Sequence, residues 1–379
     1  MQLIEIPHTL NASVSLNLKL DHNVYYVHKF LKLGGSMITS DKILIFCFLF
    51  IAATLSCAEI PCYPPDHYAP ISDAPYTFEE VRIPTSKGYV LAGTLTLPSG
   101  PVAPYPAVIM ITGSSPQDRD HMQTKRKPVS YYKPFRQIAD AISRRGIAVL
   151  RMDDQGVGCS EGGPLKNVTI QERADDDRSG IEYLRSRKEI DKKRIGIVGL
   201  SEGGNIGPMI AASDPSIRSL VVMAGSATNG FEILEYQRRL KIFERSDLTN
   251  AEKEQELAES IEGLNKAFSK GEGSPWIRSF LTYNPLYAAQ KVSCPVLILH
   301  GDKDAHVPVG HAYILAKAMR SSGNNDVTLK IFLNHNHLFL EDPDGRMSGY
   351  KTLLWHTNKL SEDMLKTIAE WLSKHLAED

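Results

Sequence analysis

The chain has 379 residues, and its 43 basic and 44 acidic side chains leave a formal net charge of −1 at pH 7. So even a balance gives no electrostatic basis for binding nucleic acid, and it favours a small-molecule partner. Five cysteines without metal-ligand spacing predict no metal centre, and we expect no cofactor.

The N-terminal part predicts an export signal. Lys42 precedes an apolar run over residues 43–55, which is followed by Ser56-Cys57-Ala58. This run is shorter than the about 20 residues of a membrane span and has the form of a signal peptide. We expect a signal peptide over 37–58, cleaved after Ala58, and a secreted or periplasmic protein without a stable membrane span.

The expected signal peptide also decides how the residues before and after it are interpreted. Residues 1–36 precede Met37, which we take as the true initiator, so 1–36 would come from an upstream start. Cys57 leaves a lipid anchor as an alternative to simple cleavage. A linker over 59–77 then leads into one domain over 78–379, since about 320 mature residues suit a single domain with an insertion.

In chain order, strand and helix patterns alternate along this domain. A hairpin over 78–84 and 89–97 comes first. The further strands are expected at 106–112, 147–152, 194–199, 218–223, 295–300 and 327–332. The helices are expected at 132–145, 170–187, 203–212, 310–321 and 361–376. This order predicts an α/β fold with a mostly parallel, doubly wound sheet and an N-terminal antiparallel hairpin, with functional loops at the carboxyl ends of the strands.

An insertion over about 229–290 interrupts the alternation after the strand at 218–223. Within it, residues 234–243 and 251–268 carry apolar side chains at three- and four-residue spacing among many charges. That spacing predicts two amphipathic helices.

The pentapeptide Gly199-Leu200-Ser201-Glu202-Gly203 lies between an expected strand and an expected helix. Small residues at 199 and 203 would let strand and helix approach closely and hold the serine exposed on a strained turn. A serine is a weak nucleophile unless a base reaches it. Alone, the motif is equally that of a glycine-rich turn.

A base and a carboxylate follow in the order that such a serine needs. Asp302 and Asp304 both come directly after the strand at 295–300, and His335 and His337 follow the strand at 327–332. Either aspartate is also typical of a turn that bonds its own backbone. The residues alone leave both pairs open.

Taken together, these motifs resemble the α/β-hydrolases over residues from about 80 to the C-terminus. Gly301-x-x-Asp304-x-x-Val307-Pro308 and Asn336-His337-x-Phe339 match the family's acid and histidine segments. The resemblance implies Ser201 as nucleophile, Asp304 as acid and His337 as base.

Two loops narrow the resemblance to the branch near the serine aminopeptidase-like and Xaa-Pro dipeptidyl-peptidase-like families. They are 113–120, Gly-Ser-Ser-Pro-Gln-Asp-Arg-Asp, and 151–160, where Gln155 replaces the arginine usual in this branch. Any ion pair made by that arginine would be missing here.

The family chemistry implies two backbone donors for the oxyanion. We expect them at the N–H of Glu202, which follows the nucleophile at a helix start, and at the N–H of Ser114. The Glu202 side chain has two interpretations. It would bind a substrate amino group, as in aminopeptidases, or complement the helix dipole, and the second is favoured.

By resemblance, the insertion would be a helical lid over Ser201. Its aromatic side chains are then candidates for the substrate-binding wall, each of them equally a helix-packing residue. The candidates are Phe231, Tyr236 and Trp276, with Phe243 and Phe280.

The sequence therefore predicts a secreted serine hydrolase that cleaves carboxylic esters through an acyl-enzyme. The alternative is a serine peptidase acting on short peptides, followed by an acyl thioesterase and a non-catalytic binding protein of the same fold. Of the cysteines expected in the mature chain, Cys62, Cys159 and Cys294, none is expected in a disulfide, because an odd trio gives no framework.

Overall fold

The structure, a computed structural model, describes residues 14–21, 24–33, 36–37, 62–70, 73–100, 103–122, 132–349, 353 and 359–377. The chain divides into two units, Met1–Ala58 and Glu59–Asp379. The first holds an antiparallel sheet of β1 (Val14–Asp21), β2 (Val24–Leu33) and β3 (Ser36–Met37). Residues 38–58, which carry most of the expected signal peptide, lie outside the described residues. The domain boundaries given above stay predictions.

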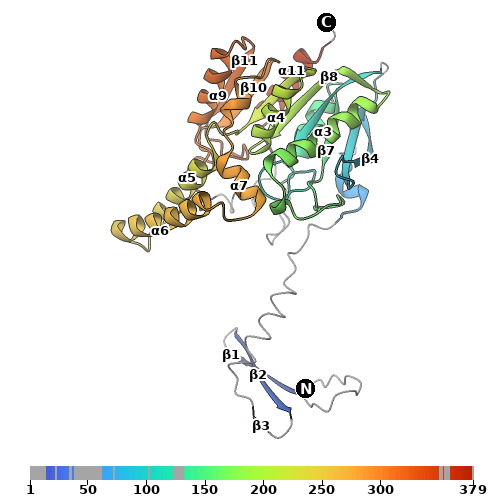
Figure 1. Ribbon diagram of the computed structural model, residues 1–379. Helices are drawn as coiled ribbons and strands as arrows, with labels where there is room; N and C mark the ends of the chain where they lie inside the picture. Colours follow the sequence, from blue (N-terminus) through green and yellow to red (C-terminus); the bar gives the residue numbers. More distant parts are fainter. Residues whose placement is uncertain are drawn as a thin grey trace. The chain divides into compact units, whose positions relative to one another are not determined.

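The second unit is built on an eight-stranded sheet (Figure 1), in the order β11-β10-β9-β8-β6-β7-β5-β4. The β4–β5 and β5–β7 pairs are antiparallel, and the other neighbouring strands of this sheet pair in parallel. The strands are β4 (Tyr76–Pro84), β5 (Val90–Pro98), β6 (Tyr105–Ile111), β7 (Ala148–Met152), β8 (Ile190–Leu200), β9 (Ile217–Met223), β10 (Val296–Gly301) and β11 (Val327–Phe332). The predicted fold class is confirmed.

Helices cover both faces of this sheet and bury a separate apolar layer on each. One layer packs under α3 (Ile170–Ser186), α4 (Gly203–Ser213) and α9 (Gly310–Ser321). The other packs under α2 (Pro134–Ser143) and α11 (Glu362–His375). Strands buried on both faces read as continuous apolar runs, which explains why β6, β8 and β10 were evident in the sequence. No helix in the described ranges has both the length and the apolar character needed to cross a membrane.

The parallel strands set the position of the functional loops. β6, β8, β10 and β11 run in the same direction, so their carboxyl ends meet at one edge of the sheet. The segments that begin at Thr112, Ser201, Asp302 and Leu333 leave the sheet at that edge. Ligand sites of open α/β sheets lie at such edges.

The insertion after β9 is helical, as expected. It holds α5 (Gly230–Phe243), α6 (Asn250–Ser269), α7 (Pro275–Thr282) and the short α8 (Leu286–Ala289). Thr249 begins α6 with a capping box to Glu252, and Asn229 caps α5. In Figure 1, α5 and α6 extend away from the sheet. Its action as a lid stays a prediction.

The expectation that Cys62, Cys159 and Cys294 form no disulfide is wrong, because Cys62 and Cys159 are bonded to each other. Counting an odd number of cysteines says only that one is left over. Cys294 is that residue, and it is free and half-buried.

Candidate active site

Ser201 lies on a strained turn between β8 and α4. Its φ of 60° is in the left-handed region, which a residue other than glycine adopts at a cost. A Cβ at Gly199 would overlap the Gly203 carbonyl, and a Cβ at Gly203 would overlap the Ile111 carbonyl. Both glycines are therefore required by the close approach of β6, β8 and α4.

The structure brings Ser201, His337 and Asp304 into one hydrogen-bonded chain. His337 Nε2 lies 2.9 Å from Ser201 Oγ, and His337 Nδ1 lies 2.7 Å from Asp304 Oδ2. A carboxylate can only accept, so Nδ1 carries the proton and Nε2 accepts from the serine hydroxyl. This is the arrangement of a nucleophile, a base and a group that orients the base.

Asp304 is held ionised at the end of β10. Its other oxygen accepts from the backbone N–H of His306 (2.8 Å) and of Val307 (2.9 Å). Burial alone would raise the pKa of Asp304, but the charge and hydrogen bond of His337, with those of His300, hold that pKa well below its usual range. Asp304 therefore stays negative beside His337.

His337 and Asp304, rather than His335 and Asp302, form this chain of hydrogen bonds with Ser201. His335 Nδ1 is 2.7 Å from the Leu333 carbonyl oxygen, and its ring is near Phe332. The Asp302 carboxylate has a buried oxygen without a hydrogen-bond partner, and Asp304 is the aspartate bonded to His337.

The loop after β6 passes close to Ser201. A Cβ at Gly113 would lie 3.3 Å from Ser201 Cβ, so the loop passes directly beside the nucleophile. The Gly113 N–H donates to Gln117 Oε1 at 2.8 Å. Because that N–H is already used, the next one, of Ser114, is the candidate for an oxyanion.

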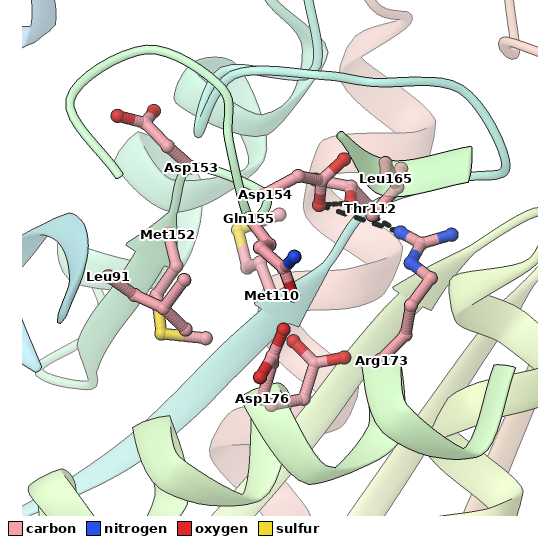
Figure 2. A pocket seen from close by; sticks show the side chains of 11 residues that line it. Leu91, Met110, Thr112, Met152, Asp153, Asp154, Gln155, Leu165, Arg173 and Asp176 are labelled. Atoms are coloured by element: carbon pink, nitrogen blue, oxygen red, sulfur yellow. Dashed lines mark hydrogen bonds and ion pairs between the residues drawn. The ribbon is translucent and has the colours of Figure 1, made fainter. Parts of the chain in front are cut away.

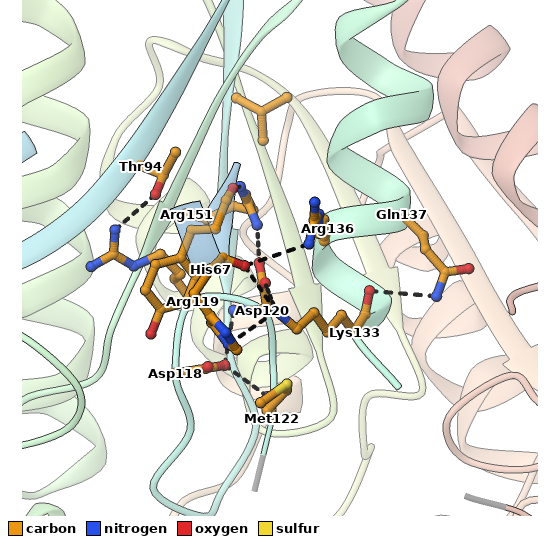
Figure 3. Close-up of polar contacts among 12 residues, drawn as sticks. His67, Thr94, Asp118, Arg119, Asp120, Met122, Lys133, Arg136, Gln137 and Arg151 are labelled. Atoms are coloured by element: carbon orange, nitrogen blue, oxygen red, sulfur yellow. Dashed lines mark hydrogen bonds and ion pairs between the residues drawn. The ribbon is translucent and has the colours of Figure 1, made fainter. Parts of the chain in front are cut away.

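Buried charges anchor this loop (Figure 3). Arg119, fully buried, forms two hydrogen bonds to Asp153 with its side chain, 3.0 and 2.8 Å long, and pairs with Glu80 at 2.5 Å. The next residue, Asp120, pairs with the buried Arg151, as Figure 3 shows. Since breaking a buried pair is costly, the loop has little freedom to move.

His121, at the end of the anchored loop, was not predicted as a site residue. Its φ is 66°, its ring packs at a tilt against Phe135 with centroids 4.8 Å apart, and it lines the same cavity as Ser201. Burial, with the nearby His337 and Arg173, lowers the pKa of His121 to about 3, so the imidazole is neutral. Nothing in the local sequence distinguishes it from a surface histidine.

The Glu202 side chain is buried rather than exposed on the first turn of α4. It pairs with Arg173 at 3.0 Å and accepts from Trp276 Nε1 at 3.1 Å. Burial raises the pKa of Glu202, and the Arg173 charge opposes the rise. The carboxylate is thus compensated within the protein, a situation that neither sequence interpretation anticipated.

Gln155 stands where the resemblance has an arginine, and its amide makes neutral bonds. Its Oε1 accepts from the Tyr89 hydroxyl at 2.7 Å, and its Nε2 donates to the Gly163 carbonyl at 3.0 Å. Gln155 lines a small cavity of about 20 Å³, which has room for about one water and is also lined by Asp154, Asp176 and Asp177. Figure 2 shows Asp154 and Asp176 beside it.

A cavity of about 240 Å³ opens over Ser201 and His337. Ser114 and Glu202 also line it, and the insertion contributes Ile233, Gln237 and Phe280. Phe280 was one of the candidate aromatic residues.

The three main wall candidates are not in that lining. Phe231 packs against Phe268, with ring centroids 5.6 Å apart, and Trp276 stacks on Phe280 and binds Glu202. Tyr236 is half-buried on α5. Their contact with substrate stays a prediction.

This fold, with a strained serine directly after one of its central strands, defines the α/β-hydrolases, and the chain is a serine hydrolase of that class. A family model described as the prolyl oligopeptidase family matches residues 164–376, so the chain belongs to that family. A second, described as esterase FrsA-like, matches residues 68–234.

Several individual proteins with similarity to the chain are named esterases. Esterase EstD of Thermotoga maritima is 26% identical over 306 residues, which are 79% of this chain and 69% of EstD. Esterase FrsA of Yersinia pestis is 28% identical over 37% of this chain, a match that covers 30% of FrsA. The solved structure of esterase Pf2001 of Pyrococcus furiosus shares the fold, with a TM-score of 0.54 at 16% identity, covering 84% of this chain and 98% of its own.

Proposed function

We propose that this protein hydrolyses carboxylic esters through Ser201, His337 and Asp304, with an acyl-enzyme intermediate. The observation that carries the proposal is the pair of distances along the triad, 2.9 Å from Ser201 to His337 and 2.7 Å from His337 to Asp304, at the wall of a cavity. A serine becomes a nucleophile when a positioned base accepts its proton.

The proposed steps use groups that are already oriented. Ser201 Oγ attacks the ester carbonyl carbon while its proton moves to His337 Nε2, and Asp304 stabilises the imidazolium. The N–H groups of Ser114 and Glu202 stabilise the oxyanion. His337 then protonates the leaving alcohol. A water molecule, activated by the same histidine, releases the acid and restores Ser201.

The state of Glu202 favours esters over peptides with a free amino terminus. A carboxylate that recognises a substrate ammonium needs a charge that is not already compensated. Here Arg173 lies 3.0 Å from the Glu202 carboxylate, and Trp276 Nε1 donates a hydrogen bond to the same carboxylate. The membership in the prolyl oligopeptidase family keeps a serine peptidase as the second candidate.

Three substrates assayed side by side test the reaction. We expect a short p-nitrophenyl ester to be turned over with the highest kcat/KM, ahead of an acyl thioester, and an aminoacyl-nitroanilide with a free amine to be the poorest. Ser201→Ala should lower ester turnover by at least about 10³-fold. His335→Ala, on the same loop as His337, serves as the control and should leave it unchanged. Faster cleavage of the nitroanilide would instead support the peptidase.

We further propose that the protein acts outside the cytoplasm. The Cys62–Cys159 disulfide supports this location, because such bonds persist in oxidising compartments. Mass spectrometry of the exported protein should find an N-terminus at Glu59, and one at Met1 would contradict the proposal.

A further inference from the structure

Arg173 is a buried cation at the centre of contacts that surround the proposed oxyanion site. It lies on α3, and only 4% of its side chain is exposed. Its Nη1 is 3.0 Å from Glu202 Oε2, and its Nη2 is 3.2 Å from Thr112 Oγ1 and 3.5 Å from Asp154 Oδ1. Figure 2 shows the guanidinium directed toward Asp154 and Thr112.

One side of this cluster holds the segment that carries the Ser114 donor. Asp154 Oδ1 accepts from Thr112 Oγ1 at 2.5 Å, and its Oδ2 accepts from the Gln117 N–H at 3.0 Å. Gln117 in turn accepts from the Gly113 N–H at 2.8 Å. The backbone on both sides of Ser114 is therefore tied to Asp154, and Asp154 to Arg173.

The other side holds the segment that carries the second donor. Glu202 is the residue before α4, so its N–H points out of the start of that helix. Its carboxylate pairs with Arg173 and accepts a hydrogen bond from Trp276 Nε1 of α7. Arg173 thus contacts a side chain from each of the two segments that supply oxyanion donors.

The charges around Arg173 make it difficult to replace. Asp154 and Asp177 lie near it from the β7 loop and from α3, and Glu202 faces it from the elbow. Burial raises the pKa of Asp154 to about 6 and that of Asp177 well above its ordinary value, against the pull of Arg173. The guanidinium is a buried charge that compensates them, and its rigid planar fork directs Nη1 at Glu202 and Nη2 at Thr112 and Asp154.

We propose that Arg173 is a positioning residue that holds the Ser114 and Glu202 backbone donors at the separation an oxyanion requires. This rests on the proposed function, because it assumes that those two N–H groups act on an intermediate formed at Ser201. Arg173 itself does not touch the reacting atoms. A shift of about 1 Å in such donors is enough to cost about 100-fold in rate.

Arg173→Met tests the proposal, with Arg178→Met as the matched control. Arg178 lies on the same helix, is about one third exposed, and pairs with Asp175. For each variant, kcat and KM for a p-nitrophenyl ester are measured per active site, counted by fluorophosphonate titration. The inhibition constant of a trifluoromethyl ketone, which forms a tetrahedral oxyanion on serine, is measured in parallel.

We expect Arg173→Met to lower kcat about 100-fold with little change in KM, and to weaken the ketone by a similar factor. Arg178→Met should change neither. A purely structural role would reduce the number of titratable sites but leave kcat per site and ketone affinity intact, and that result would overturn the proposal.

Thr112→Val provides a second variant should Arg173→Met fail to fold. It removes the hydroxyl shared by Arg173 and Asp154 and leaves every charge in place. We expect kcat and ketone affinity to fall together, and unchanged values of both would again overturn the proposal. Failure of the proposed function is distinguishable, because Ser201→Ala would then still hydrolyse the ester in the same assay.

Discussion

At the residue scale, the proposed base His337 depends on a permanently charged Asp304. The two backbone donors and the two histidines around it stabilise the carboxylate, so it fixes the tautomer of His337. An amide in its place accepts the same backbone bonds but holds the wrong imidazole tautomer.

Asp304→Asn is therefore expected to leave the fold intact and lower kcat by about 10³–10⁴-fold. Steady-state kinetics with a p-nitrophenyl ester, with circular dichroism to check folding, measures this. Retention of more than a tenth of the wild-type kcat would show that His337 does not depend on Asp304.

Asp118 gives the loop below the oxyanion site a pH dependence. Burial and the neighbouring Asp120 raise the pKa of Asp118 to about 7, from an ordinary value of 3.8. The folded state therefore keeps a proton that the unfolded chain has lost between about pH 4 and pH 7. The stabilisation from this group is present at pH 4 and is lost as the pH rises to about 7.

Asp118→Asn imitates the protonated form, and its Oδ1 still accepts from the N–H groups of Asp120 and Met122. We expect its melting temperature to rise relative to wild type as the pH increases from 4 to 8. Thermal unfolding at single pH steps measures the difference. A constant difference over this range would mean that Asp118 is ionised throughout in the folded protein.

The functional residues that could be predicted from the sequence are those that lie in short local motifs. Ser201, Asp304 and His337 each follow a strand within a short recognisable segment, and the structure places them in contact. Arg173 and His121 have no such segment. Arg173 reaches Glu202 across 29 sequence positions through packing of α3 on α4, which no local pattern encodes.

At the element scale, the elbow depends on glycines that let three backbones meet. A Cβ at Gly203 overlaps backbone carbonyl oxygens of the β6 end, which do not move aside as a flexible side chain would. By contrast, Gly263 on α6 has nothing within 4 Å of its Cβ position.

Gly203→Ala should destabilise the protein by about 1–3 kcal/mol and remove most of the activity, because it pushes α4 away from β6. Gly263→Ala, the control, should stabilise it by about 0.5–1 kcal/mol, since alanine is the better residue inside a helix. Chemical denaturation gives both values. The opposite order of the two effects would contradict the close packing at the elbow.

In the insertion, the helices could be predicted from the sequence but their contacts could not. The three- and four-residue spacing predicted α5 and α6 correctly, but it identifies an apolar face and not what that face contacts. Phe231, a candidate for the substrate-binding wall, packs on Phe268 within the insertion, and Ile233, two positions on, lines the cavity.

At the scale of the whole molecule, the alternation of strands and helices was sufficient to predict a sheet whose strands run mostly parallel. The disulfide was not predictable, because Cys62 and Cys159 are separated by 97 positions and meet only in the folded chain. The bond joins the start of the second unit to the loop after β7, where the Cys159 N–H donates to Asp153.

Replacing both cysteines by serine should lower the free energy of unfolding by about 2–4 kcal/mol, because the unfolded chain gains the freedom that the cross-link removes. Cys294→Ser, at the free cysteine, is the matched control and should have a much smaller effect. Denaturation of the oxidised protein in urea gives both comparisons. Equal effects of the two changes would argue that the disulfide adds no stability.

Covalent labelling tests whether Ser201 is the nucleophile. The folded protein is treated with a fluorophosphonate and digested, and the labelled peptide is identified by mass spectrometry. The account predicts one adduct, on Ser201, that appears in step with the loss of ester hydrolysis. A natively folded protein that hydrolyses esters while Ser201 stays unlabelled would contradict it.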